Sequence, residues 1–120
     1  MPSTDYALAK RMVLRDFRQG ELSRDEVCDA HPELLRAARH IGAHTDAVCP
    51  VCGGRGLRHV SYVYGDGLKR ANGTCISHAR ELERLGSSVD EFARYVVEVC
   101  IDCSWNHLVQ RHLMGRRHAG

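Results

Sequence analysis

The spacing of apolar side chains predicts three helices in the first 42 residues. One apolar stripe with helical spacing runs through residues 4–18 and comprises Tyr6, Ala9, Val13 and Phe17. Ser23, followed three residues later by Glu26, is a capping box and predicts the start of a short second helix. Pro32 ends that helix and suits the first turn of a third one, over residues 32–41.

Alternating apolar and polar positions predict two strands later in the chain, at residues 57–64 and 95–101. Between them, residues 75–85 have the apolar spacing of a helix. Ser88 to Glu91 is a second capping-box pattern, which predicts a short helical turn through Arg94. We therefore expect a small sheet interrupted by a helical insertion.

Residues 104–114 predict a last helix, with Ser104 as its cap. Its apolar stripe comprises Trp105, Leu108, Val109 and Leu113. We expect Trp105 to be buried, with this helix packed on the sheet. Residues 115–120 are expected to be a frayed basic tail.

The composition is that of an ordinary globular domain, with 43% hydrophobic and 27% charged residues in a chain of 120. It excludes collagen, a coiled coil and wholesale disorder. No apolar stretch approaches the ~20 residues that a membrane-spanning helix needs. The first five residues lack the basic and apolar regions of a secretory signal, so we expect a soluble, cytoplasmic protein.

The cysteines carry the strongest chemical signal in the sequence. Cys49 and Cys52 form one Cys-x-x-Cys pair, and Cys100 and Cys103 form another. Two thiolates separated by two residues on a tight turn can reach one ion, and zinc takes four such ligands in a tetrahedron. Gly53 and the following Gly54 permit the backbone turn that such a knuckle needs. We predict one structural Zn²⁺ in a zinc ribbon whose insertion covers residues 65–94.

Three other interpretations of these cysteines compete with structural zinc. A thioredoxin-like redox motif, structural disulfides and an iron–sulfur cluster each use cysteines. Two separated Cys-x-x-Cys pairs fit a thioredoxin-like motif poorly, because that motif uses one pair. Structural disulfides are disfavoured in a chain without an evident export signal. Four thiolates leave no open position for a catalytic water, so we do not expect an enzyme. Cys28 and Cys75 are interpreted as buried, inert thiols, with a second metal site or a Cys28–Cys75 bridge as alternatives.

Positive charge is concentrated in two segments. Residues 49–74 carry four basic residues and one acidic residue, and residues 104–120 carry three basic residues and no acidic one. The net charge is +3 in each, although the whole chain carries only +2. If the two knuckles share one ion, these segments begin close together and could form one face for phosphates. The candidate binding residues are Arg55, Arg58, Lys69, Arg70, Arg111, Arg116 and Arg117. Pairing with acidic neighbours is the alternative.

Several stretches resemble a small actinobacterial, zinc-ribbon-like family that is catalogued as a domain of unknown function. The resemblance covers roughly residues 5–114, and its most specific part is Cys103 to Leu108. It implies a cytoplasmic bacterial protein and supplies no activity. The stretches are Glu26-Val27-Cys28-Asp29-Ala30, Pro32-Glu33-Leu34-Leu35-Arg36-Ala37-Ala38, Cys49-Pro50-Val51-Cys52, Tyr64-Gly65-Asp66, Val96-Val97-Glu98-Val99-Cys100 and Cys103-Ser104-Trp105-Asn106-His107-Leu108.

These features predict a single α+β domain over residues 1–120. It would comprise a helical segment (1–42), a four-cysteine zinc ribbon (49–103), a C-terminal helix (104–114) packed on the ribbon, and the basic tail (115–120). The predicted function is a non-enzymatic, zinc-stabilised binding module for nucleic acid or for a nucleoprotein machine such as RNA polymerase or the ribosome.

Three alternatives to this function remain. The first is a protein–protein adaptor without nucleic-acid contact, with a partner on the face of Tyr62 and Tyr64. The second is a helix-turn-helix over residues 24–41, in which Arg36 and Arg39 would face a groove. The third is an enzyme of unrecognised type.

Overall fold

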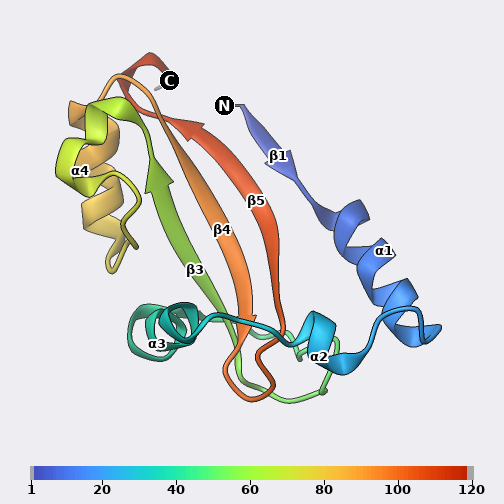
Figure 1. The fold of residues 1–120 in the computed structure, drawn as a ribbon. Coiled ribbons are helices and arrows are strands. Elements are labelled where there is room, and N and C mark those ends of the chain that lie inside the picture. Colours follow the sequence, from blue (N-terminus) through green and yellow to red (C-terminus); the bar gives the residue numbers. More distant parts are fainter. Residues whose placement is uncertain (1, 119–120) are drawn as a thin grey trace.

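The strands pair into one five-stranded antiparallel sheet in the computed structural model, which describes residues 2–118 (Figure 1). Their order across the sheet is β1-β5-β4-β3-β2. The long central strands are rich in β-branched and aromatic side chains, which suit a pleated surface. The strands are β1 (Ser3–Asp5), β2 (Ala43–His44), β3 (Leu57–Tyr64), β4 (Phe92–Cys100) and β5 (Asn106–Met114).

The helices of the first half form largely as the sequence predicts. Around α2, the Ser23 hydroxyl accepts a hydrogen bond from the Glu26 amide at 3.2 Å, and the Glu26 carboxylate accepts one from the Ser23 amide at 2.8 Å. After α1, Gly20 takes a φ of +81°, which suits glycine at a helix end. The helices are α1 (Ala7–Arg18), α2 (Arg24–Val27), α3 (Pro32–Ile41) and α4 (Ala79–Ser88), with 3₁₀ turns η1 (Asp66–Ala71) and η2 (Arg116–His118).

The predicted C-terminal helix is wrong, because residues 106–114 form strand β5. This strand pairs with β4 on one side and with β1 on the other, so its backbone groups are satisfied within the sheet. The β4–β5 register shifts between Val96 and Val97, which leaves Val109 as an extra residue in β5. That bulge interrupts the two-residue alternation, so the apolar spacing of β5 imitates a helix.

Smaller differences occur around the insertion. The predicted helical turn after Ser88 is absent: Ser88 is the last residue of α4, and β4 begins at Phe92. The segment before α1 forms the short strand β1 instead of the start of a helix. Residues 116–118 of the expected tail form η2, and the last two residues of that tail lie outside the described part of the chain.

Three apolar clusters cover the sheet. Side chains alternate between faces, so Tyr62, Tyr64 and Tyr95 share one face, here called the tyrosine face. Near the cysteines, α3 covers that face through Ala38, which packs on Val60 and Val99. The opposite face carries α1 and α2 near the cysteines, and η1 and α4 at the far end. A hollow on the tyrosine face is lined by strand residues alone, namely Tyr64, Tyr95, Val97 and Leu108.

Candidate metal centre

The hairpin of β3 and β4 brings the two cysteine pairs together. Cys49 and Cys52 lie in the loop that leads from β2 into β3. Cys100 is the last residue of β4, and Cys103 lies in the turn that leads into β5. Leu57, five residues after Cys52, pairs directly with Cys100. The first knuckle therefore folds against the second although 47 residues lie between them.

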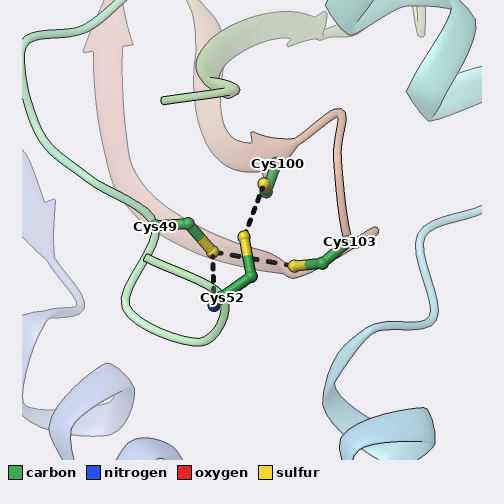
Figure 2. Close-up of side chains that lie close together, drawn as sticks. All are labelled: Cys49, Cys52, Cys100 and Cys103. Atoms are coloured by element: carbon green, nitrogen blue, oxygen red, sulfur yellow. Dashed lines mark hydrogen bonds between the residues drawn. The ribbon is translucent and has the colours of Figure 1, made fainter. Parts of the chain in front are cut away.

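The four sulfur atoms have the arrangement that a tetrahedral ion requires. All four lie within 4.8 Å of one another (Figure 2). Cys49 Sγ is 3.7 Å from Cys103 Sγ, and Cys52 Sγ is 3.7 Å from Cys100 Sγ. A Zn–S bond of about 2.3 Å implies a sulfur–sulfur separation of about 3.8 Å in a regular tetrahedron. The four cysteines are thus positioned to hold one metal ion.

Backbone amides of the first knuckle point at its sulfurs. The amides of Val51 and Cys52 lie 3.4 Å and 3.5 Å from Cys49 Sγ, and the Gly54 amide lies 3.4 Å from Cys52 Sγ. Gly53 adopts a φ of +73°, as the sequence predicts for this turn. A side chain at Gly54 would approach the Cys52 sulfur to 3.3 Å. These amide contacts favour the thiolate form that a metal binds.

Burial has the opposite effect on three of the thiols, because it favours the neutral thiol over the thiolate. It raises the pKa of Cys49 and of Cys100 to about 11 each, and that of Cys103 to about 12. The pKa of Cys52 is lowered, chiefly by the Gly54 amide. Four thiolates so close together need a compensating cation, because buried negative charges otherwise disfavour one another. The donor set therefore fits a thiophilic divalent metal.

A fifth cysteine touches the cluster, which the sequence did not reveal. Cys28 Sγ lies 3.6 Å from Cys103 Sγ. Cys75 instead lies beside β3, where it forms an isolated bridge with Tyr62, and burial raises its pKa. All six cysteines are free thiols, so the alternative of a Cys28–Cys75 bridge is not seen. The signal that could have pointed to Cys28 is its place directly after the short capped helix α2.

Trp105 is part of the core, as predicted, although it precedes a strand instead of belonging to a helix. It is fully buried, and its Nε1–H donates a hydrogen bond of 2.8 Å to Glu98. The other Glu98 oxygen accepts a hydrogen bond of 2.8 Å from Lys10 on α1. In the sequence, the only hint of this buried network is that Glu98 lies between the apolar residues Val97 and Val99.

The seven basic candidates do not form one surface. Arg55 and Arg58 lie at the cysteine end of the sheet, where Arg58 pairs with Val99. Arg111 lies within β5, where it pairs with Tyr95, and the other four lie beyond the opposite ends of the strands: Lys69 and Arg70 in η1, and Arg116 and Arg117 in η2. Nine residues of extended chain cover about 30 Å. Because residues 106–114 form a strand, they carry the C-terminal arginines away from the cysteines.

Two of these arginines are paired with acids. Arg116 lies 2.6 Å from the Asp90 carboxylate, and Arg117 lies 3.7 Å from the Glu91 carboxylate. His118 also contacts Glu91, at 2.7 Å. The hydrogen bond from His118 is the main reason that the pKa of Glu91 is lowered. The acidic segment thus partly neutralises the C-terminal basic one, as the alternative interpretation of these residues expected.

The fold and the site define an α+β protein with a four-cysteine candidate metal centre. The chain belongs to a family of unknown function, DUF5318, whose model matches residues 2–120. It is 43% identical over 111 residues to uncharacterized proteins of Mycobacterium bovis and of two Mycobacterium tuberculosis strains, which covers 92% of this chain and 80% of theirs. The actinobacterial resemblance is thereby confirmed. No solved structure matches the chain significantly.

No helix among residues 2–118 is both long enough and apolar enough to cross a bilayer.

Proposed function

We propose that this protein is a non-enzymatic binding module stabilised by one zinc ion on Cys49, Cys52, Cys100 and Cys103. The support is a set of four sulfurs within 4.8 Å of one another, with sulfur–sulfur contacts of 3.7 Å. Four thiolates favour zinc or iron over harder metals, and they would saturate zinc. A saturated ion has no position for a reacting water, which is why the role assigned to it is structural.

Elemental analysis of the purified protein tests the metal. We expect one zinc per chain, and no visible absorbance. Iron with a charge-transfer spectrum would replace zinc by an iron–sulfur centre. A metal-free, folded chain would refute the metal proposal.

The contact surface in this proposal is the open part of the tyrosine face. Tyr64 and Tyr95 meet edge to face, with ring centroids 5.5 Å apart. The Arg111 guanidinium lies 5.7 Å from the centre of the Tyr95 ring, and its Nε donates to the Tyr95 hydroxyl at 3.1 Å. Tyr64 and Tyr95 line a shallow hollow on this face together with Val97 and Leu108. Tyr64 is 47% exposed, so the surface presents a ring to solvent.

Single-stranded nucleic acid fits this surface best. Exposed aromatic rings on an open sheet stack on bases, and a neighbouring arginine contributes both stacking and charge. A second hollow continues from Tyr64 to Arg111, Arg116 and Arg117, and could follow a phosphate backbone. Asp66, Asp90 and Glu91 line the same hollow, so the positive charge there is moderate. The proposal therefore rests on the two tyrosines and Arg111 more than on net charge.

Fluorescence anisotropy with labelled single-stranded DNA and RNA tests this function at low and high salt. We expect binding that weakens as salt rises, because neutralised phosphates release counterions. Tyr64→Ala should weaken binding at every salt concentration. Arg111→Ala should weaken it and lower the salt slope by about one. Arg11→Ala is the matched control, because Arg11 is an exposed arginine on α1, which packs on the opposite face.

A protein partner on the same face is the second candidate. The aliphatic side chains of Val97 and Leu108 favour it, and so does the pairing of Arg116 with Asp90. Anisotropy that does not respond to either nucleic acid would favour this adaptor function. Affinity purification from the native host, with Tyr64→Ala as the comparison, would then identify a partner lost with the ring.

A further inference from the structure

A fifth sulfur is held against the candidate metal centre. Cys28 follows α2 and lies 75 positions before Cys103, yet the two sulfurs are 3.6 Å apart. This separation matches the 3.7 Å contacts inside the cluster. Cys28 nevertheless does not belong to the set of four whose sulfurs all lie within 4.8 Å of one another. It therefore contacts one ligand without completing the coordination of the ion.

Contacts that do not involve sulfur keep this segment in place. The Ala30 amide donates a hydrogen bond to the Ser104 carbonyl at 3.0 Å. The Asn106 side chain donates one to the Asp29 carboxylate at 2.9 Å. The residues after Cys28 are thus fastened to the residues after Cys103. This arrangement would keep the two thiols adjacent whether or not a metal is bound.

The two sulfurs are also more accessible than the two buried ligands of the cluster. Cys49 and Cys100 are 2% and 0% exposed, whereas Cys28, Cys103 and Cys52 are half-buried, and of these three only Cys28 lies outside the set of four ligands. A small oxidant can therefore reach Cys103 more easily than it can reach Cys49 or Cys100. We propose that Cys28 is the resolving thiol of a reversible disulfide with Cys103, formed by hydrogen peroxide and coupled to loss of the metal. The coupling rests on the proposed zinc ion, whereas the pairing rests on the sulfur geometry.

The reaction proceeds in two balanced steps. The Cys103 thiolate attacks one peroxide oxygen, the O–O bond breaks, and Cys103 becomes a sulfenic acid while the second oxygen leaves as water after taking a proton. The Cys28 sulfur then attacks the Cys103 sulfur, the S–O bond breaks, and water leaves with the thiol proton. The two sulfurs lose two electrons in total, and the peroxide is reduced to two waters.

Disulfide formation removes one of the four ligands. The sulfurs must move from 3.6 Å to about 2.05 Å, so Cys103 turns toward Cys28 and away from the ion. Three thiolates hold zinc less tightly than four, and the ion dissociates. A dithiol reductant reverses the reaction by thiol–disulfide exchange and restores the site.

The test compares the zinc-loaded wild-type protein with Cys28→Ser and with Cys75→Ser, treated with hydrogen peroxide. A chromophoric chelator reports zinc release, and mass spectrometry of non-reduced peptides identifies the disulfide. We expect a Cys28–Cys103 linkage in the wild type, with zinc release that dithiothreitol reverses. Cys28→Ser should accumulate oxygenated Cys103, and dithiothreitol should restore several-fold less of its zinc binding than in the wild type, because no second thiol traps the sulfenic acid before it is oxidised further. Cys75→Ser is the matched control, because Cys75 is a half-buried thiol beside Tyr62, and it should behave as the wild type.

Two results would overturn the inference. One is a disulfide confined to the four cluster cysteines in the wild type. The other is zinc binding in oxidised Cys28→Ser that dithiothreitol restores as fully as in the wild type. If the purified chain carries no zinc, the metal proposal fails separately, and the peptide map alone decides the pairing: a Cys28–Cys103 linkage supports it and any other linkage overturns it. The map is measured on the wild type, so it does not depend on the folding of a variant.

Discussion

The two ends of the sheet are closed in different ways. At the cysteine end, the buried cluster includes Cys49 and Cys100 beside Leu57 and Trp105, so thiols replace part of the apolar core. At the far end, Phe92 and its buried neighbours are all aliphatic or aromatic, and α4 packs against them. The comparison indicates that the far end is stabilised by ordinary apolar burial. The stability of the cysteine end depends on a bound cation that neutralises its thiolates.

Removing the metal should have the largest effect and should fall on the cysteine end. Substituting any one of Cys49, Cys52, Cys100 or Cys103 by Ser should reduce zinc binding and destabilise the fold, since structural zinc contributes on the order of 10 kcal/mol in small domains. Thermal unfolding with and without a chelator measures the loss. In hydrogen exchange, amides near Leu57 should lose protection before those near Val63. Equal loss at both ends would remove the distinction between them.

Trp105→Ala should be the most damaging change at the cysteine end that leaves every ligand in place. Truncating this fully buried ring is expected to cost roughly 3–5 kcal/mol. It also removes the hydrogen bond to the buried Glu98 carboxylate. Chemical denaturation measures the change, with Trp105→Phe as a milder comparison that keeps an aromatic ring. A tryptophan emission maximum typical of full exposure in the wild type would contradict this account.

Phe92→Ala tests the far end in the same way. The ring is 2% exposed in an apolar cluster, so its loss should cost about 3 kcal/mol. Zinc affinity should stay at the wild-type value, because the cluster contains no candidate ligand. A competition assay with a chelator of known affinity checks this. Weakened zinc binding would show that the two ends are more strongly coupled than their separate clusters indicate.

Arg116→Ala should have the smallest effect. Arg116 and Asp90 are both well exposed, at 59% and 65%, and exposed ion pairs contribute less than about 1 kcal/mol. The midpoint of denaturation should therefore barely move, and salt should reduce the difference further. A loss comparable to that of Phe92→Ala would mean that ion pairing, and not apolar burial, closes the far end.

The elements that have strong local sequence signals form as the sequence predicts. Strand β3 and helix α3 have the predicted bounds, 57–64 and 32–41, and the Ser23–Glu26 capping box forms as expected. The α+β class is confirmed as well. Each of these signals depends on side chains within a few residues of one another, so it acts in the same way before the chain has folded.

Elements whose conformation depends on distant partners were not predictable in the same way. Residues 104–114 have an apolar spacing that a helix could use, and the bulge in β5 conceals the alternation of a strand. Pairing with β4 and with β1 decides in favour of the strand, and both partners are remote in sequence. The error had a functional consequence, because it placed Arg116 and Arg117 near the cysteines.

By itself, the sequence determined the four candidate ligands, the capping box of α2 and the burial of Trp105. The Cys-x-x-Cys spacing is a local property, because a tight turn brings both of its thiols to one side wherever the turn is placed. Only the tertiary structure decided that Cys28 touches Cys103, that Lys10 and Trp105 share Glu98, and that the basic residues lie at two ends. These contacts join residues far apart in the chain, and their geometry follows from the register of the whole sheet and the helices packed on it.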